Sequence, residues 1–466
     1  MNKDQRTEDH LGMLDEYGHR LFIIPAEIRG FFQRRKKIVH VFLLIVFLLL
    51  PWIHLGGHQA IWVDIPGRHF TFFGLSLYAH DAPLIFFVLM ILTLSLALLT
   101  ALVGRAWCGW ACPQTVFIET IYRQIETWIE GNYIARRKLR DQDLDLRKIR
   151  LGLTKWAAYF VVSSLIAHSF VAYFVGSKNL LTMIEGSPEQ NMSYFVFVSL
   201  MTLVLMFNFG WFREQFCLIM CPYGRFQSVL MDSHSLTVMY DEKRGEPRKG
   251  QWQEGQEKGD CVSCQRCVQV CPTGIDIRNG TQFECIACTA CIDACDEIME
   301  KVHKPKGLIR YKALTEKKIQ WFRSRVLSYG GLLLISVIAL IVLLSVNKPY
   351  RIEVLRGKDA PYTIVPMWGK NVVQNHFDVR FESHSQEELQ VQIEIDGPLA
   401  NQFQMIVPEN PMRVVAGEKR NLPIFIQAPE TIFSGLTQIP LDIRFTELKS
   451  GEVLLKKTIT FVGPAK

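Results

Sequence analysis

The last third of this 466-residue chain contains no cysteine, since all 12 cysteines lie between Cys108 and Cys295. Any domain formed by the last third must therefore be stable without a disulfide. The sequence also lacks a glycine-rich phosphate loop of the P-loop or Rossmann kind, so nothing in it indicates nucleotide binding. The net charge is only +7, and the basic residues lie beside apolar runs. This pattern favours loops that flank a membrane, and we expect no nucleic-acid partner.

Five long apolar runs are present in a sequence that is 49% hydrophobic and 21% charged. A helix needs about 20 apolar residues to cross a bilayer. The runs predict transmembrane helices at about 38–54, 83–103, 156–175, 194–212 and 329–346. The first run follows a long polar segment and has no small-residue cleavage site, so we interpret it as a span and not as a signal peptide. The composition thus predicts a multi-pass membrane protein with soluble parts.

Basic residues are distributed unevenly among the loops. Four of them occupy positions 34–37 and ten lie between residues 104 and 155, whereas the two alternate loops hold one each. Basic loops tend to stay in the cytoplasm. The N-terminal segment 1–37, the loop 104–155 and the region 213–328 are therefore predicted to be cytoplasmic. Five crossings would then place residues 347–466 on the opposite side of the membrane.

Eight cysteines form two sets with matching spacing. The first set reads C-x2-C-x2-C-x3-C-P, which is typical of bacterial ferredoxins, and the second set is followed by Asp296 instead of proline. In this pattern three closely spaced thiolates bind one [4Fe–4S] cluster and the fourth binds the other. The predicted ligands are Cys261, Cys264, Cys267 and Cys295 for cluster 1, and Cys271, Cys285, Cys288 and Cys291 for cluster 2. We expect them in a ferredoxin-like α+β domain at about 255–310.

Zinc and disulfides are the alternatives for these eight cysteines. Zinc sites generally use separate C-x2-C pairs and not three cysteines at two successive x2 gaps. Disulfides do not persist in a reducing cytoplasm, where the predicted topology puts this segment. Both alternatives are therefore less favoured than two [4Fe–4S] clusters.

A C-x3-C-P element occurs twice, at Cys108–Cys112 and at Cys217–Cys221, each time after a pair of predicted spans. The membrane part is therefore interpreted as a duplicated helical hairpin. In a continuous helix, residues i and i+4 share a face, so each pair of thiols would project together. Four thiolates suit thiol redox chemistry, a further iron–sulfur cluster or a soft cation such as Cu(I). The spacing does not choose among these, and a single buried cysteine is also compatible with simple packing.

Apolar and polar residues alternate in the last third of the chain. The alternation runs through 372–381 and 389–396, and further short apolar segments occur at 422–427, 441–447 and 453–462. Short strands separated by turn residues predict an immunoglobulin-like β-sandwich over 347–466. No residue in it suggests catalysis, so we expect a role in interaction or spacing.

These features together resemble one known family. The run RAWCGWACPQ at Arg105–Gln114, the Cys217–Cys221 pair, the double ferredoxin insert and the C-terminal sandwich are similar to CcoG, also called FixG or RdxA. The resemblance covers nearly the whole chain. It implies a multi-pass protein of the bacterial cytoplasmic (inner) membrane, with a periplasmic C-terminal domain, that takes part in the maturation of cbb3-type cytochrome c oxidase.

The resemblance also implies an activity, the reduction of Cu(II) to Cu(I) for insertion into the oxidase. On this hypothesis an unidentified cytoplasmic donor reduces the two [4Fe–4S] clusters, and electrons reach a catalytic redox site where copper is the substrate or a bound metal. That site would consist of Cys108, Cys112, Cys217 and Cys221. Oxidase subunits or copper-delivery proteins would be the partners. A quinol-linked membrane ferredoxin, similar to those of periplasmic nitrate reduction, and an assembly scaffold without redox activity are the two alternatives.

Overall fold

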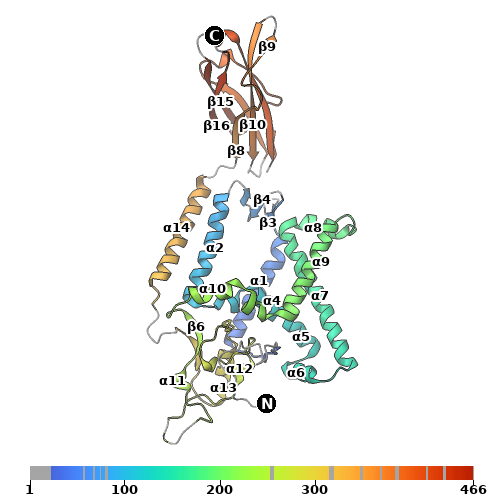
Figure 1. Cartoon of the computed structure of the whole chain (residues 1–466), viewed down its shortest axis with the longest axis vertical. Helices are drawn as coiled ribbons and strands as arrows, with labels where there is room; N and C mark the ends of the chain where they lie inside the picture. The colour runs from blue at the N-terminus through green and yellow to red at the C-terminus, as the bar shows by residue number, and fades with distance from the viewer. Residues whose placement is uncertain are drawn as a thin grey trace. The chain divides into compact units, whose positions relative to one another are not determined.

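The computed structural model describes residues 22–464 except for short gaps at 56–57, 67–68, 74, 79–81, 252–254, 256, 314–319, 347–349, 368–369, 384–387, 416–417 and 434–436. The chain divides into two compact units, residues 1–341 and 342–466. The first unit combines long helices with a small region of strands and short helices, and the second consists mainly of strands (Figure 1).

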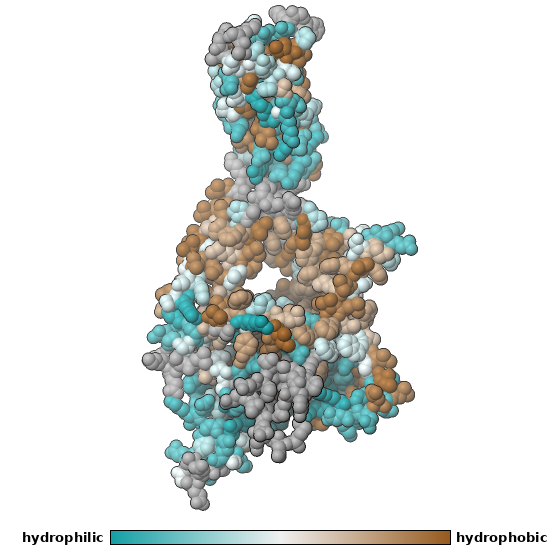
Figure 2. Space-filling model, in the orientation of Figure 1, coloured by the Kyte–Doolittle hydropathy of each residue, from teal (hydrophilic) through white to brown (hydrophobic). Residues whose placement is uncertain are grey.

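Four helices in the described part of the chain are long and apolar enough to cross a membrane. They are α2 (Ala82–Val103), α7 (Leu146–Val175), α9 (Met192–Phe207) with its π-helical continuation η4 (Asn208–Phe212), and α14 (Ser324–Val346). At most 33% of the residues in their apolar windows are buried inside the protein, so most of this apolar surface can contact lipid. Figure 2 shows exposed apolar side chains gathered over this part of the molecule. The chain is therefore a multi-pass membrane protein.

The first predicted span, 38–54, corresponds to a helix that ends earlier. Helix α1 covers Phe31–Leu49 and is followed by the 3-10 turn η1 (Leu50–Trp52), where Pro51 cannot continue the helical hydrogen bonding. Its mostly apolar part begins only at Ile38, because four basic residues precede it, and this part still contains His40. That part is shorter than the roughly 20 residues needed to cross a bilayer. A fifth crossing therefore stays a prediction.

Short elements connect the long helices of the first unit. The helical ones are α3 (Ala106–Trp110), α4 (Pro113–Phe117), the π-helical η3 (Ile118–Tyr122), α5 (Arg123–Glu130), α6 (Tyr133–Asp141), α8 (Ser177–Glu185), the π-helical η5 (Phe216–Met220) and α10 (Pro222–Leu230). The strands are β1 (His54–Leu55), β2 (His58–Gln59), β3 (Ile61–Asp64), β4 (His69–Phe72) and β5 (Leu75–Tyr78). Tyr122 and Tyr159 are fully buried, with ring centroids 4.9 Å apart, and Phe209 packs against Tyr122 at 5.2 Å. These rings join η3, α7 and η4 in one apolar core.

The eight ferredoxin cysteines lie in a small region framed by two antiparallel strands, β6 (Leu236–Tyr240) and β7 (Ile309–Ala313). Its helices are α11 (Glu242–Gly245), α12 (Arg266–Gln269), the 3-10 turn η6 (Ile277–Asn279) and α13 (Ala290–Lys301). Val238, Ile292 and Met299 form part of its buried core. The region is thus a compact α+β insert between η4 and α14.

Helix α1 is attached to this insert at its first turn. Its N-cap, Gly30, has no side chain to accept the free N–H groups. Asp293 of α13 takes that role, because its carboxylate accepts hydrogen bonds from the backbone N–H of Phe32 at 3.1 Å and of Gln33 at 2.7 Å. A Cβ on residue 30 would lie 2.2 Å from Cγ of Asp293, so glycine is needed for this close approach.

The second unit is a sandwich of two antiparallel sheets, as the alternating pattern predicts. One sheet has the order β12-β14-β10-β8, with β9 also paired to β10, and the other has the order β13-β11-β15-β16. The strands are β8 (Tyr350–Arg356), β9 (Thr363–Met367), β10 (Lys370–Ser383), β11 (Leu389–Asp396), β12 (Gln404–Ile406), β13 (Met412–Val414), β14 (Lys419–Pro429), β15 (Gln438–Glu447) and β16 (Val453–Val462). Phe381, Phe445 and Phe461 are completely buried between the sheets. Apolar packing thus holds this domain without a disulfide.

Candidate iron–sulfur and membrane thiol sites

The ferredoxin cysteines line two small, partly open cavities. The cysteines that line the first are Cys267, Cys271, Cys285, Cys288 and Cys291. Those that line the second are Cys261, Cys264, Cys267 and Cys295. Each cavity therefore takes three cysteines from one spacing motif and at least one from the other, with Cys267 lining both, and two-cluster ferredoxins likewise combine cysteines of both motifs at each cluster.

The same unusual backbone geometry occurs in both cysteine loops. Ser263 and Gln265, on either side of Cys264, have φ of 55°, and Ala287 and Thr289, on either side of Cys288, have φ of 52° and 64°. Non-glycine residues seldom adopt this left-handed conformation. Alternation of this conformation with the right-handed one turns successive N–H groups toward a common point and forms a cradle for an anion. A thiolate-ligated iron–sulfur cluster carries net negative charge, so the loops fit such a group.

The donor set and its burial also fit iron–sulfur clusters. Burial raises the pKa of the Cys267, Cys288 and Cys295 thiols to about 12. Buried thiolates therefore need cations such as iron beside them. Among the residues that the structure describes, no three His, Cys, Asp or Glu side chains converge closely enough to hold a single metal ion. A cubane cluster is compatible with this wider spacing, because each thiolate binds a different iron atom.

The two C-x3-C-P elements have the same local structure, which is not one continuous helix. Cys108 and Cys217 each lie in a short helical segment, whereas Cys112 (φ −62°, ψ 128°) and Cys221 (φ −72°, ψ 112°) are extended N-cap residues followed by proline at the first helical position. Proline disfavours the helical conformation of the residue before it. Each pair of cysteines therefore spans a helix break.

Side chains from each C-x3-C-P element reach across to the other. Gln227, which is completely buried on α10, donates from Nε2 to Cys108 Sγ at 3.2 Å. Gln114 of α4 donates to the carbonyl oxygen of Arg213 at 3.1 Å and exchanges hydrogen bonds with Asn208 at 2.9 and 3.1 Å. The two hairpin ends are thus joined by buried amides in both directions.

The four thiols of these elements are mutual neighbours. Burial raises the pKa of Cys108 to about 11, and the nearby Cys112 and Cys221 add to the increase. Burial also raises the pKa of Cys217, and Cys112, Cys108 and Cys221 contribute in the same direction. Burial raises the pKa of Cys112, although the N–H groups of Gln114 and Thr115 at the start of α4 partly oppose this by hydrogen bonding to the thiolate. We call these four residues the membrane thiol site.

The segment that carries Cys108 and Cys112 touches one of the two ferredoxin loops. A Cβ on Gly109 would lie only 2.6 Å from the carbonyl oxygen of Ala287 and 2.7 Å from that of Ile286. Arg105 donates to the carbonyl oxygen of Phe283, and its guanidinium lies 4.6 Å from the centroid of the Phe283 ring. The 283–288 loop, which carries two cysteines of the first cavity, therefore packs directly on the Cys108–Cys112 segment.

A buried cation also lies beside this loop. Lys36 of α1, only 3% exposed, donates to the carbonyl oxygen of Cys288 at 3.3 Å and forms an ion pair with Glu119 at 2.6 Å. Gln33 donates to the same carbonyl oxygen at 3.0 Å. Helix α1 thus packs against both the ferredoxin insert and the segment that follows the first C-x3-C-P element.

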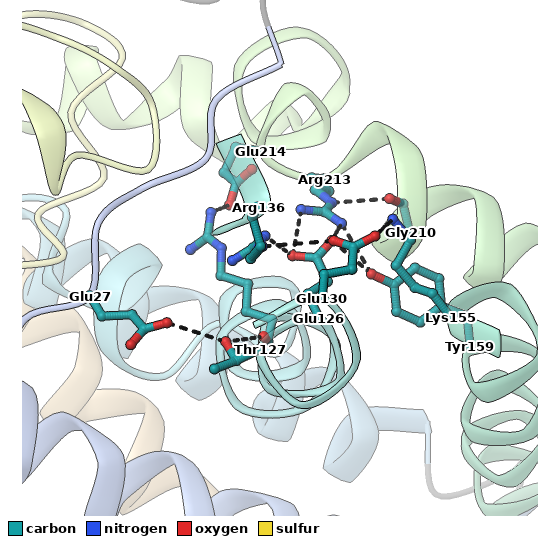
Figure 3. A network of polar contacts seen from close by, with 11 residues as sticks. Glu27, Glu126, Thr127, Glu130, Arg136, Lys155, Tyr159, Gly210, Arg213 and Glu214 are labelled. Atoms are coloured by element: carbon teal, nitrogen blue, oxygen red, sulfur yellow. Dashed lines mark hydrogen bonds and ion pairs between the residues drawn. The ribbon is translucent and has the colours of Figure 1, made fainter. Parts of the chain in front are cut away.

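Charged side chains form a buried network around Glu126, shown in Figure 3. Its carboxylate, 1% exposed, pairs with Arg136 and Arg213 and accepts a hydrogen bond from Tyr159 at 2.8 Å. Burial alone would raise the pKa of Glu126, but Arg213, followed by Arg136, more than offsets it and lowers the pKa to about 2. The network fixes the backbone at Arg213, which has a left-handed φ of 53° four residues before Cys217.

Sequence reasoning did not find this network or the bridging amides. Arg136 belongs to the basic loop 104–155, which the sequence predicts to be a cytoplasmic loop beside the membrane, and it is only 5% exposed. A signal was present in the acidic residues Glu119, Glu126 and Glu130, which are spaced seven and four residues apart within this loop. Gln114 and Gln227 carry no local signal, because their partners lie more than 90 residues away in the chain.

Comparison with known proteins identifies the family. The chain is 36% identical over 400 residues to Protein RdxB of Cereibacter sphaeroides, a match that covers 81% of this chain and 83% of RdxB. The chain belongs to the FixG/RdxA family. Protein RdxA of the same organism is 32% identical over 398 residues, which are 82% of this chain and 83% of RdxA. Nitrogen fixation protein FixG of Rhizobium meliloti is 35% identical over 309 residues, which are 64% of this chain and 59% of FixG.

Three family models match separate parts of this FixG/RdxA protein. They are a 4Fe-4S dicluster domain at residues 212–314, a 4Fe-4S binding domain at 84–140, and the Ig-like fold at the C-terminal of FixG at 340–464. A crystal structure of a FixG-related protein from Vibrio parahaemolyticus aligns with 25% of this chain and 97% of its own length, at 16% identity and a TM-score of 0.21. As a FixG/RdxA protein with these domains, the chain is a membrane-bound iron–sulfur electron-transfer protein.

Proposed function

We propose that this protein reduces Cu(II) to Cu(I) at the membrane thiol site and thereby supports assembly of cbb3-type cytochrome c oxidase. The observation that carries the proposal is the contact of Gly109 with the peptide at Ile286–Ala287. It brings a four-thiol site next to a loop with ferredoxin cysteines. In an electron-transfer protein, a site in this position can accept electrons from the neighbouring ferredoxin part.

The proposed resident cofactors are two [4Fe–4S] clusters, which supply one-electron storage when bound. The proposed ligand sets are Cys261, Cys264, Cys267 and Cys295 for cluster 1 and Cys271, Cys285, Cys288 and Cys291 for cluster 2. The cysteine composition of the two cavities supports this division. The repeated left-handed residues in both loops support it as well.

Copper enters this scheme as the substrate. Each Cu(II) takes up one electron, and a cytoplasmic one-electron donor is oxidised by one electron in return. Soft thiolate ligands favour Cu(I) over Cu(II). Cys108, Cys112, Cys217 and Cys221 would therefore make reduction more favourable for copper that approaches them. Copper-delivery proteins or oxidase subunits are the partners that this role requires.

The proposed orientation follows from the charge of the loops. The ten basic residues between 104 and 155 support a cytoplasmic position for that loop. The ferredoxin insert, which packs on the Cys108–Cys112 segment, would share that side. With five crossings of the bacterial inner membrane, the C-terminal sandwich would be periplasmic.

The test is a single-turnover reduction assay on the full chain, purified anaerobically in detergent. The protein is reduced with dithionite, freed of dithionite by gel filtration, and mixed with Cu(II) and a Cu(I)-specific chelator. The double variant Cys108→Ser/Cys217→Ser should lose copper reduction while its ferredoxin EPR signals persist. Met220→Leu is the matched control, because Met220 lies in the same segment and is 63% exposed. Wild-type copper reduction by the double variant would refute the proposal.

The same sample discriminates the quinol-linked alternative. Rapid reduction of the protein by a quinol, together with no transfer of electrons to Cu(II), would replace the proposed function by that of a quinol-linked carrier. Full oxidase assembly in cells whose protein lacks the ferredoxin cysteines would instead indicate a scaffold.

A further inference from the structure

A buried lysine lies where helix α1 meets the loop that carries Cys285 and Cys288. Lys36 is only 3% exposed, whereas its neighbours Arg35 and Lys37 on the same helix are exposed. Its Nζ donates to the carbonyl oxygen of Cys288 at 3.3 Å. Burial of an ammonium group is costly, so lysine is almost never fully buried without a partner. The position of Lys36 therefore requires an explanation from the charges around it.

The partner of Lys36 is Glu119, whose carboxylate lies 2.6 Å from Nζ. Glu119 belongs to η3, in the segment that follows the first C-x3-C-P element. Burial raises the pKa of the Cys288 thiol, Lys36 opposes this increase, and Glu119 adds to it by less than Lys36 removes. The positive end of the ion pair is therefore the end that acts more strongly on Cys288.

Other contacts of α1 hold Lys36 in this position. Gln33, one turn earlier on the helix, donates from Nε2 to the same carbonyl oxygen of Cys288 at 3.0 Å. Asp293 of α13 accepts hydrogen bonds from the backbone N–H groups of Phe32 and Gln33. Solvent and salt screen a buried charge much less than an exposed one. Lys36 is thus a fixed positive charge beside the loop.

The contact of Lys36 with Cys288 has a consequence for electron transfer. Cys288 lines the first cavity and is a proposed ligand of cluster 2. Reduction by one electron adds one negative charge to a cluster, so a fixed positive charge nearby favours the reduced form. Net charge and hydrogen bonds near the ligands are among the features that set the reduction potential of iron–sulfur clusters.

We propose that Lys36 is a positioning residue that acts through Cys288 and raises the reduction potential of cluster 2. In this reaction cluster 2 takes up one electron from the cytoplasmic donor, and Lys36 neither changes a bond nor gains or loses a proton. The electron is thereby favoured on the cluster whose loop contacts Gly109, beside the membrane thiol site. Lys36 lies outside the residues that the three family models match. The inference rests on the proposed ligand set of cluster 2 and is independent of copper.

An EPR-monitored redox titration of the full chain, purified anaerobically in detergent, tests the proposal. In Lys36→Met, the equilibrium constant for reduction of one cluster should fall at least tenfold, because a neighbouring charge changes an equilibrium between two charge states by about tenfold or more. A tenfold change lowers the midpoint potential of a one-electron couple by about 59 mV. The midpoint potential of the other cluster should stay unchanged. Lys37→Met is the matched control, since it removes an exposed charge from the adjacent position and should leave both potentials unchanged.

A second variant guards against misfolding of Lys36→Met. Glu119→Gln removes the negative partner and keeps the ammonium group on the carbonyl oxygen of Cys288, so the same midpoint potential should rise. The double variant Lys36→Met/Glu119→Gln should lie between the two single variants. A packing defect would instead move the potential in the same direction in both. Unchanged potentials in Lys36→Met, or shifts of the same sign in the two single variants, overturn the proposal.

Iron counts and the copper assay on the same samples separate this inference from the proposed function. Two clusters give about 8 iron atoms per chain. This count in wild type and Lys36→Met, with no shift of either potential, would overturn the inference and leave the proposed cofactors intact. A wild-type count of about 4 would overturn the second cluster of the proposed function and the inference with it. The expected shifts in a protein that does not reduce Cu(II) would keep the inference and overturn the proposed copper reduction.

Discussion

Replacement of Glu126 by glutamine should destabilise the first unit strongly. The change keeps the size of the side chain but leaves the buried Arg136 and Arg213 without their shared counter-ion. The pKa of Glu126 falls from an ordinary value of 4.5 to about 2 in the folded protein. One pKa unit corresponds to about 1.4 kcal/mol, so the folded protein favours the charged over the neutral carboxyl by about 3 kcal/mol more than water does. Loss of one partner of a buried ion pair typically costs about 3–5 kcal/mol, which agrees with this value.

Thermal unfolding of the full chain in detergent, followed by tryptophan fluorescence, measures the effect. The matched control is Glu297→Gln, because Glu297 forms an exposed i,i+4 pair with Lys301 at 2.5 Å. Such a pair contributes about 0.3–0.5 kcal/mol, so the control should unfold close to the wild-type temperature. The double variant Glu126→Gln/Arg136→Met should recover part of the loss, since it removes one of the uncompensated charges. Equal unfolding temperatures for Glu126→Gln and Glu297→Gln would refute the reasoning.

Three further predictions concern other contacts. Gly109→Ala should impair copper reduction at least tenfold in the single-turnover assay with the ferredoxin EPR signals retained, because the new Cβ would push the thiol segment away from the ferredoxin loop. Asp293→Ala should lower stability by about 1 kcal/mol in thermal unfolding, because it removes the cap of α1. Stability of the first unit should fall as the pH drops from about 4.5 toward 2 in a pH series of melts. Over this range the unfolded chain takes up a proton at Glu126, whereas the folded protein keeps this carboxylate ionised until the pH reaches about 2.

Each of these predictions has a control in the chain. A Cβ on Gly152 would meet no atom within 4 Å, so Gly152→Ala should leave copper reduction unchanged. Glu300, on the same helix as Asp293, has a side chain that is 65% exposed, so Glu300→Ala should have little effect on stability. The Glu126→Gln variant should lose the decrease between pH 4.5 and 2 that the wild type shows. An equally steep decrease in that variant would assign the pH dependence to other carboxylates.

Local sequence was sufficient for the features that depend on short-range spacing. A bilayer-spanning helix depends on the apolar length of one segment. Four of the five predicted spans correspond to helices that are long and apolar enough to cross a membrane. The sandwich depends on alternation within single strands, and β11 and β15 show it in their burial. The ligand sets of the two clusters stay a prediction: the four cysteines predicted for cluster 1 line the second cavity, and the four predicted for cluster 2 line the first cavity together with Cys267.

Features that depend on distant partners were beyond the reach of local patterns. Arg213 and Glu126 pair across 87 residues, and Gln227 reaches Cys108 across 119. The helix break at Cys112 and Cys221 is, by contrast, a local effect, because Pro113 and Pro222 constrain the residue before them. The early end of α1 could also have been predicted from Pro51. Long-range polar contacts follow from the packing of the whole unit and have no signature in a single segment.

The cap that Asp293 provides to α1 has a consequence for the synthesis of the protein. The N–H of Phe32 leaves the ribosome 261 residues before the carboxylate that accepts its hydrogen bond. At about 5–20 residues per second, this interval is roughly 10 to 50 s. During that time the first turn of the helix must rely on water or other temporary partners. Completion of the first helix is therefore a late event, and it occurs only when the helix that carries Cys291 and Cys295 has folded against it.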